Sequence, residues 1–134
     1  MTRLINIEGV GEVFARKLEE AGVGSIEGLL EAGATAKGRQ ELEAKTGINH
    51  TFILRWVNHG DLFRIKGVGE EYAELLESAG VDTVAELAQR RPENLHEKLV
   101  AVNLEKHCVR HMPGLSQVQA WIENAKQLPR KVSY

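Results

Sequence analysis

The chain has 134 residues, of which 43% are hydrophobic and 27% charged, and its net charge at pH 7 is −2. These values are near the averages for globular proteins and argue against disordered, collagen-like and membrane-spanning classes. Cys108 is the single cysteine, so an internal disulfide framework is excluded. No signal-peptide pattern follows Met1, and we therefore expect a cytoplasmic protein with no membrane partner.

Charge is distributed unevenly along the chain. Residues 1–88 carry nine basic and fifteen acidic side chains, whereas residues 89–134 carry eight basic and four acidic ones. The small net charge argues against a strongly basic protein that coats nucleic acid. Two interpretations stay open for the basic C-terminal segment: an ordinary solvated surface, or a surface that meets a partner.

An internal repeat is the strongest feature of the sequence. Residues 7–30 recur as residues 65–88, with 12 of 24 positions identical at an offset of 58. Farther along, residues 53–57 resemble residues 118–122 at an offset of 65. The second copy therefore contains seven additional residues, which we expect within residues 104–114. Internal similarity of this kind is typical of structural repeats that pack on one another.

Apolar spacing in both copies predicts helices. Side chains that recur at intervals of four and three residues would form one apolar face after each glycine pair. These side chains are Val10, Phe14, Leu18 and Ala21 in the first copy and Val68, Tyr72, Leu76 and Ala79 in the second. Gly22 and Gly80 follow at positions where a left-handed residue commonly ends a helix, and Pro92 suits a first helical turn. No segment shows sustained alternation, so no sheet is expected.

These observations predict an all-α fold with eight to ten short helices. We expect two tandem repeats packed into one compact helical array. The first repeat would cover residues 1–58, and the second residues 59–134 with the basic C-terminal segment. A helix that contains Trp56 would connect the two repeats.

Each copy contains a Gly-Val-Gly sequence between two helical segments. A turn of two or three residues between helices at a steep angle needs positive φ or close backbone approach, and glycine permits both. The valine between the glycines would point into the core. The full pattern, from Ile7 to Leu18 and again from Ile65 to Leu76, resembles the helix-hairpin-helix motif.

Residues 53–57 and 61–69 make the resemblance more specific. With them, the whole chain resembles a bacterial family of uncharacterised proteins, described as a domain of unknown function and built from tandem helix-hairpin-helix units. This resemblance implies a fold and carries no settled activity.

In many relatives of the motif the hairpin binds nucleic acid. The resemblance implies that backbone N–H groups of both turns would contact phosphate, and these turns are Gly9, Val10 and Gly11, and Gly67, Val68 and Gly69. Unpaired amides and the positive end of the helix dipole make such a position suitable for an anion. Phosphate contacts do not distinguish bases, so binding to DNA would be largely independent of sequence.

Acidic side chains oppose this interpretation. Glu12 follows the first glycine pair, and Glu70 and Glu71 follow the second, where they would stabilise the helix but repel phosphate. Arg64 and Lys66 precede the second pair, which makes the second hairpin the better candidate for nucleic acid. The alternative is that both glycine turns are only structural corners.

Two other groups of residues have a possible chemical role. His107, Cys108 and His111, with His96 as a fourth ligand, have the residue types of a zinc site, but they lack paired cysteines. We therefore expect no metal and no cofactor, and the role of these residues is left open. Trp56 and Trp121 occupy equivalent places and suit core packing, with base stacking as the alternative.

The sequence contains none of the common catalytic motifs. It has no nucleophile elbow, no Walker loop and no His-Glu-x-x-His helix, so we expect no enzymatic activity. Two functions remain. The first is a module that binds nucleic acid weakly, and the alternative is an adaptor that keeps the scaffold and binds a protein. The oligomeric state is left open.

Overall fold

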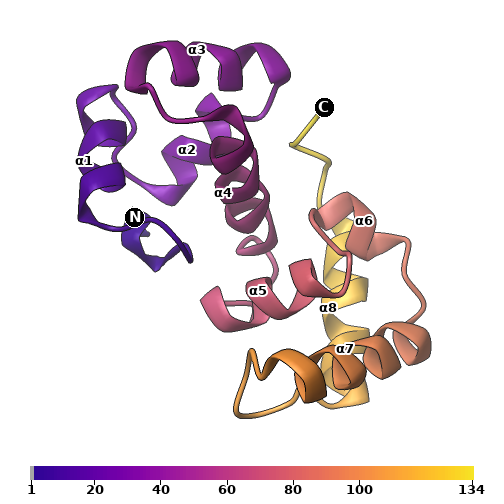
Figure 1. Cartoon of the computed structure of the whole chain (residues 1–134). Helices are drawn as coiled ribbons and strands as arrows, with labels where there is room; N and C mark the ends of the chain where they lie inside the picture. Colours follow the sequence, from indigo (N-terminus) through magenta and orange to yellow (C-terminus); the bar gives the residue numbers. More distant parts are fainter. Residues whose placement is uncertain (1) are drawn as a thin grey trace. The chain divides into compact units, whose positions relative to one another are not determined.

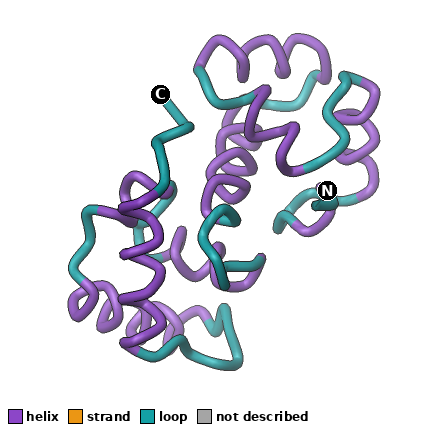
Figure 2. Tube along the Cα trace, turned by 180° about the vertical axis from the view of Figure 1, so that it is seen from behind, coloured by secondary structure: helices purple, strands orange, loops and turns teal. Residues whose placement is uncertain are grey.

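The computed structural model describes residues 2–134. In these residues the backbone forms eight α-helices and one short 3₁₀-helix, joined by loops (Figures 1 and 2). Their bounds are η1 Leu4–Asn6, α1 Glu12–Glu20, α2 Ile26–Ala32, α3 Ala36–Thr46, α4 His50–Leu62, α5 Glu70–Ser78, α6 Val84–Ala88, α7 Pro92–Lys106 and α8 Leu115–Gln127. These residues include no strand, so the predicted all-α fold is confirmed. Within the described part, no helix has both the length and the apolar character needed to cross a membrane.

The chain divides into two compact units. Unit 1 contains the described residues up to Asp61 together with Lys131–Tyr134, and unit 2 contains Leu62–Arg130. In unit 1, α1 packs against α3 and η1, and α2 packs against α3. In unit 2, α8 packs against α6 and α7, and α5 packs against α7. Buried apolar side chains from all four helices form the core of unit 2.

Corresponding helices of the two units begin and end at matching positions. Both α1 and α5 have nine residues, and their bounds differ by 58 at each end. Both α4 and α8 have thirteen residues, and their bounds differ by 65. After α1 and α5, Gly22 and Gly80 have φ angles of 92° and 90°, which are the left-handed values expected of residues that end a helix.

The second copy gains residues in two places, and it loses two because α6 has five residues where α2 has seven. Helix α7 is four residues longer than α3 and ends at Lys106. The connection before α8 covers residues 107–114, whereas residues 47–49 suffice before α4. The segment 104–114 that the repeat alignment singled out is therefore divided between the end of a helix and a long connection.

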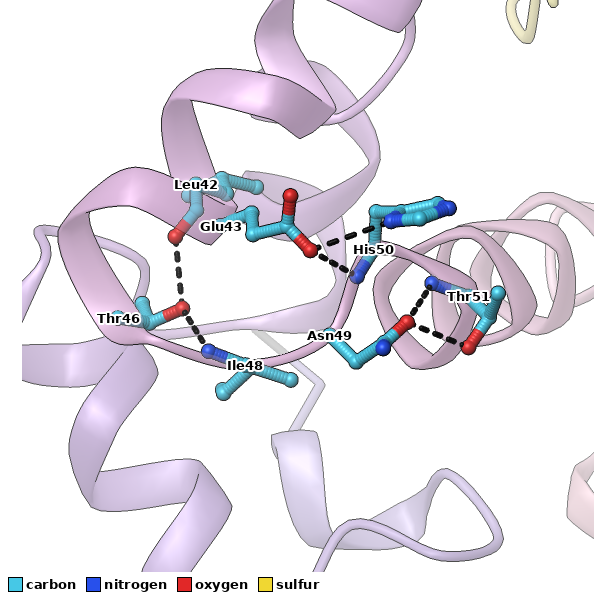
Figure 3. Close-up of polar contacts among 7 residues, drawn as sticks. All are labelled: Leu42, Glu43, Thr46, Ile48, Asn49, His50 and Thr51. Carbon is cyan, nitrogen blue, oxygen red and sulfur yellow. Dashed lines mark hydrogen bonds and ion pairs between the residues drawn. The ribbon is translucent and has the colours of Figure 1, made fainter.

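Short-range side-chain bonds shape the turn between α3 and α4 (Figure 3). The Thr46 hydroxyl donates to the Leu42 carbonyl at 2.6 Å and accepts from the Ile48 N–H at 3.1 Å. Asn49 Oδ1 accepts from the backbone N–H and the hydroxyl of Thr51. The Thr46 hydroxyl and the Asn49 side chain thus accept from two backbone N–H groups that have no helical acceptor, those of Ile48 between the helices and of Thr51 in the first turn of α4.

A carboxylate from α3 meets the first residue of α4 in the same turn. Glu43 Oε2 accepts from the His50 backbone N–H at 2.7 Å and lies 3.2 Å from His50 Nδ1 (Figure 3). The hydrogen bond from the backbone N–H is the main reason why the pKa of Glu43 is lower than its ordinary value of 4.5. A depressed pKa in the folded state means that the ionised carboxylate stabilises the fold above the unfolded pKa.

We predict that Glu43→Gln lowers the free energy of unfolding near neutral pH and that this loss shrinks as the pH falls below about 4.5. In that range the natural carboxylate is also protonated. Urea unfolding from about pH 3 to pH 7 measures the difference. Glu41→Gln, which removes an exposed carboxylate from the same helix, is the control. A difference that is constant over the whole pH range would contradict the prediction.

The left-handed residue after α1 gives a second prediction. Gly22 has a φ of +92°, and no heavy atom lies within 4 Å of the position that a Cβ would take, so Gly22→Ala changes backbone strain alone. We expect a loss of about 1–2 kcal/mol in the free energy of unfolding. Gly24 is equally open, but its φ lies outside the left-handed region. Gly24→Ala should therefore raise the free energy of unfolding, by at most about 0.5–1 kcal/mol. Equal losses for the two variants in urea unfolding would contradict this account.

Candidate nucleic-acid interface

A glycine with positive φ opens the turn before α1 and before α5. Gly9 and Gly67 have φ angles of 91° and 90° and are exposed. The following valines point into the core, because Val10 is 4% exposed and Val68 is 5% exposed. The expected inward orientation of the valine between the glycines is confirmed, and the glycines themselves are exposed. The N–H groups of Val10 and Val68 donate to the carbonyls of Ile7 and Ile65, so the expected phosphate contact of these two amides is not favoured by the structure.

A tryptophan lies beneath each of these glycines. Trp56 Nε1 is 3.6 Å from the position that a Cβ would take at Gly9, and Trp121 Nε1 is 3.4 Å from that position at Gly67. Both indoles are only 2% exposed. The alternative of base stacking on Trp56 or Trp121 is therefore wrong, and the indoles pack in the cores of their units.

Each indole has an aromatic partner from the helix after the turn. The ring centroids of Phe14 and Trp56 are 5.1 Å apart with an angle of 54°, and those of Tyr72 and Trp121 are 5.1 Å apart with an angle of 56°. Tilted pairs at this distance are favourable arrangements of aromatic rings. In unit 1, Phe52 extends the group by stacking on Trp56. These aromatic contacts pack the first turns of α1 and α5 against α4 and α8, which carry the tryptophans.

Both glycine turns end at a helix N-terminus with no side-chain cap. Gly11 and Gly69 are the N-cap residues of α1 and α5, and neither helix receives a capping bond from a side chain. By contrast, hydroxyl groups of Ser25, Thr35 and Thr83 cap α2, α3 and α6. Amides in a first helical turn have no helical acceptor and carry the positive end of the dipole. An anion could be held at either terminus.

The charged residues around the second turn have opposing effects. Lys66 is exposed, and its backbone N–H donates to Asn124 Oδ1 at 2.9 Å, which ties the turn to α8. Glu70 and Glu71 lie in the first turn of α5. The ammonium group would attract a phosphate at this turn, whereas the two carboxylates would repel it.

Arg64 makes a side-chain hydrogen bond within unit 2. Its side chain is half-buried, and Nη2 donates to the Pro129 carbonyl at 2.7 Å. This bond joins the segment before the turn to the segment after α8. Lys66 is therefore the better placed of the two predicted basic residues to meet an anion from solvent.

A shallow hollow of about 320 Å³ adjoins the second turn. It is lined by Gly67, Gly69, Glu70, Glu71, Tyr72 and His111. The Tyr72 hydroxyl donates to the His111 carbonyl at 3.0 Å, so the long connection before α8 forms part of this surface. Sequence reasoning missed this contact. The only available signals were the tyrosine in place of Phe14 and the additional residues before α8.

The histidines and the cysteine of the possible metal set are not arranged as ligands. His107 ends α7 with a φ of 53°, and Cys108 is half-buried with Sγ 4.0 Å from Ser78 Oγ. His111 lines the hollow at the second turn, and His96 lies on α7. Among residues 2–134, no group of three or more histidine, cysteine, aspartate or glutamate side chains could hold a metal ion.

Comparison with protein families gives one match over most of the chain. Residues 8–128 match the model of a family described as a domain of unknown function (DUF4332). Comparisons with curated proteins and with solved structures gave no match. The matched segment contains both glycine turns and all eight α-helices. The chain therefore belongs to the DUF4332 family.

Proposed function

We propose that the chain binds nucleic acid weakly and without sequence preference, through the turn at residues 67–69. The observation that supports this proposal is the exposed, uncapped N-terminus of α5 beside the ammonium group of Lys66. On this proposal, the two glycine turns are helix-hairpin-helix motifs in a bacterial, cytoplasmic protein that has no catalytic activity and no cofactor.

The chemistry of the turn suits the phosphate backbone. Exposed amides at Gly69 and in the first turn of α5 would donate to phosphate oxygens, and Lys66 would add a charge. Such contacts position a protein on the duplex without reading the base edges. The carboxylates of Glu70 and Glu71 reduce the attraction, and for that reason we expect low affinity.

The turn at residues 9–11 would serve as a second, weaker contact. It has the same positive φ at Gly9 and the same uncapped N-terminus at α1. Glu8 replaces the lysine that precedes the glycines in the second turn, and Glu12 lies in the first helical turn. The local charge is therefore less favourable to phosphate than at Lys66.

A second candidate function is an adaptor that binds a protein. The observation that favours it is apolar exposure in unit 1, where Val13 on α1 is 69% exposed and Phe52 on α4 is 47% exposed. Acidic residues at both turns suit a basic partner better than a nucleic acid. Exposed aromatic side chains are enriched at protein interfaces.

The first prediction from this proposal concerns salt and Lys66. Duplex DNA labelled with a fluorophore should bind the chain, and log affinity should fall with log salt by about 0.9 for each neutralised phosphate. Lys66→Glu replaces an attraction of about 1 kcal/mol by a similar repulsion, which weakens binding about 30-fold. Fluorescence anisotropy between about 20 and 200 mM salt measures both effects.

Lys37→Glu is the matched control, because it makes the same charge change at an exposed residue of α3. Both variants should keep the thermal stability of the natural chain to within a few degrees, which corresponds to about 0.5 kcal/mol. No binding at the lowest salt would overturn the proposal. Equal affinity losses for Lys66→Glu and Lys37→Glu would remove the second turn as the contact.

The second prediction separates the two functions. Glu71→Gln removes one carboxylate from the first turn of α5, so affinity for DNA should rise about fivefold, which corresponds to about 1 kcal/mol. The same variant should lose about 0.3–1 kcal/mol of stability, because the carboxylate favours the helix dipole. Glu97→Gln on α7 is the control and should leave affinity unchanged. Unchanged DNA affinity in Glu71→Gln would favour the adaptor function.

A further inference from the structure

A short extended segment crosses the connection between α2 and α3 in unit 1. The segment is Lys131–Tyr134, which we call the strap. The Ser133 N–H donates to the Ala34 carbonyl at 2.8 Å, and the Ser133 hydroxyl contacts the same oxygen at 3.4 Å. Val132 is only 2% exposed, so its side chain is almost completely buried. The strap is bound through its backbone and one apolar side chain.

Arg39 provides a second hydrogen bond to the strap. Its side chain is 6% exposed, Nη1 donates to the Gly33 carbonyl at 2.8 Å, and Nη2 donates to the Ser133 carbonyl at 2.7 Å. Burial lowers the pKa of Arg39, and an electrostatic interaction with Tyr134 opposes this effect. Guanidinium groups stay protonated in proteins, so Arg39 is a buried cation whose hydrogen bonds need acceptors. Opening the strap would remove the Ser133 carbonyl, which is one of the two carbonyl acceptors of Arg39.

The connection between α2 and α3 (residues 33–35), which we call the α2–α3 corner, binds the backbone of one residue in the way that the edge of a β-strand does. In an extended chain the N–H and C=O of the same residue point to the same side. Ala34 O and Arg39 Nη2 take these two groups of Ser133 as acceptor and donor. The corner itself is tightly built, because a Cβ at Gly33 would lie 2.5 Å from Val57 Cγ2. A fixed donor and acceptor of this kind suit the main chain of any extended peptide.

The binding surface extends past the strap. A hollow of about 530 Å³ lies in unit 1, with Gln40, Glu43, His50 and Leu54 among the residues that line it. Arg39 and Tyr134 also line it, so the hollow is continuous with the strap site. Tyr134 lies at the hollow and is 60% exposed. A peptide held at the corner would therefore also contact the residues that line this hollow.

We propose that unit 1 contains a binding site for an extended peptide, formed by the α2–α3 corner and Arg39 and occupied in cis by the strap. The ligand class is an extended segment that places a β-branched apolar side chain before the residue whose backbone is recognised. The strap acts as an intramolecular occupant that opens, and a peptide of the same pattern can replace it. This site is separate from the glycine turns and does not depend on the proposed binding of nucleic acid.

The test uses the full chain and a labelled peptide that copies residues 129–134. Val132→Asp combined with Ser133→Pro should open the strap, because the first puts a charge in a buried place and the second removes the N–H donor. The opened chain should bind the peptide at least about tenfold more tightly than the natural chain, whose own strap competes at millimolar effective concentration. Fluorescence anisotropy measures the affinity, and a peptide with the same two substitutions is the control.

Arg39 gives a second readout. In the opened chain, Arg39→Met should weaken binding of the peptide about tenfold or more, because the peptide carbonyl loses the guanidinium group that donates to it. Lys37→Met removes the same charge from an exposed residue of the same helix that does not line the hollow, and it should keep the affinity. Failure of the folded, opened chain to bind the peptide would overturn the proposal, with folding checked by circular dichroism. A dimer of the natural chain that Val132→Asp dissociates would also overturn it, because a second copy would then supply the occupant.

If the opened chain loses its helical content, the natural chain decides the matter. Excess unlabelled peptide should then increase hydrogen exchange at the Ser133 amide several-fold, because it displaces the strap from the Ala34 carbonyl. The control peptide should have no effect. Unchanged exchange at saturating peptide would overturn the proposal.

Discussion

The structure depends on a close contact between a glycine turn and a buried indole. At Gly9 and Gly67 the backbone has a φ near 90° and passes directly over the Nε1 edge of a tryptophan. A side chain in that conformation would be strained by its positive φ, although a Cβ would meet the indole only at ordinary van der Waals distance. The turn places the next valine in the core and leaves its glycines on the surface, while the valine N–H donates to the carbonyl of Ile7 or Ile65. The same constraint therefore shapes the core and exposes the candidate binding surface.

The first turns of α1 and α5 combine two effects that act in opposite directions. Glutamates at these positions favour the helix dipole, and they also repel the anion that the uncapped amides would attract. At the second turn, Lys66 partly compensates, whereas Glu8 occupies the equivalent place in the first. Stability and anion affinity are thus coupled through the same carboxylates, and the two turns are unequal although their backbones match.

The two proposed sites use different physical principles. At the second turn, amides and a lysine would meet a mobile anion at the surface, where solvent and salt screen the attraction. At the α2–α3 corner, the buried Arg39 and the Ala34 carbonyl bind the main chain of an extended segment. Desolvation makes the second kind of contact more directional, because an unsatisfied buried cation is costly.

Local patterns in the sequence determined the helices, the glycine turns and the repeat. The offsets of 58 and 65 predicted from residue identity recur in the bounds of α1 and α5 and of α4 and α8, because periodicity, caps and positive φ act within a few residues. Only the tertiary structure decided the contact of Tyr72 with His111 and the bond of Arg39 to Ser133, 94 residues away. Such partners meet because separate segments fold against one another, and no spacing in the chain encodes which carbonyl a buried guanidinium will reach.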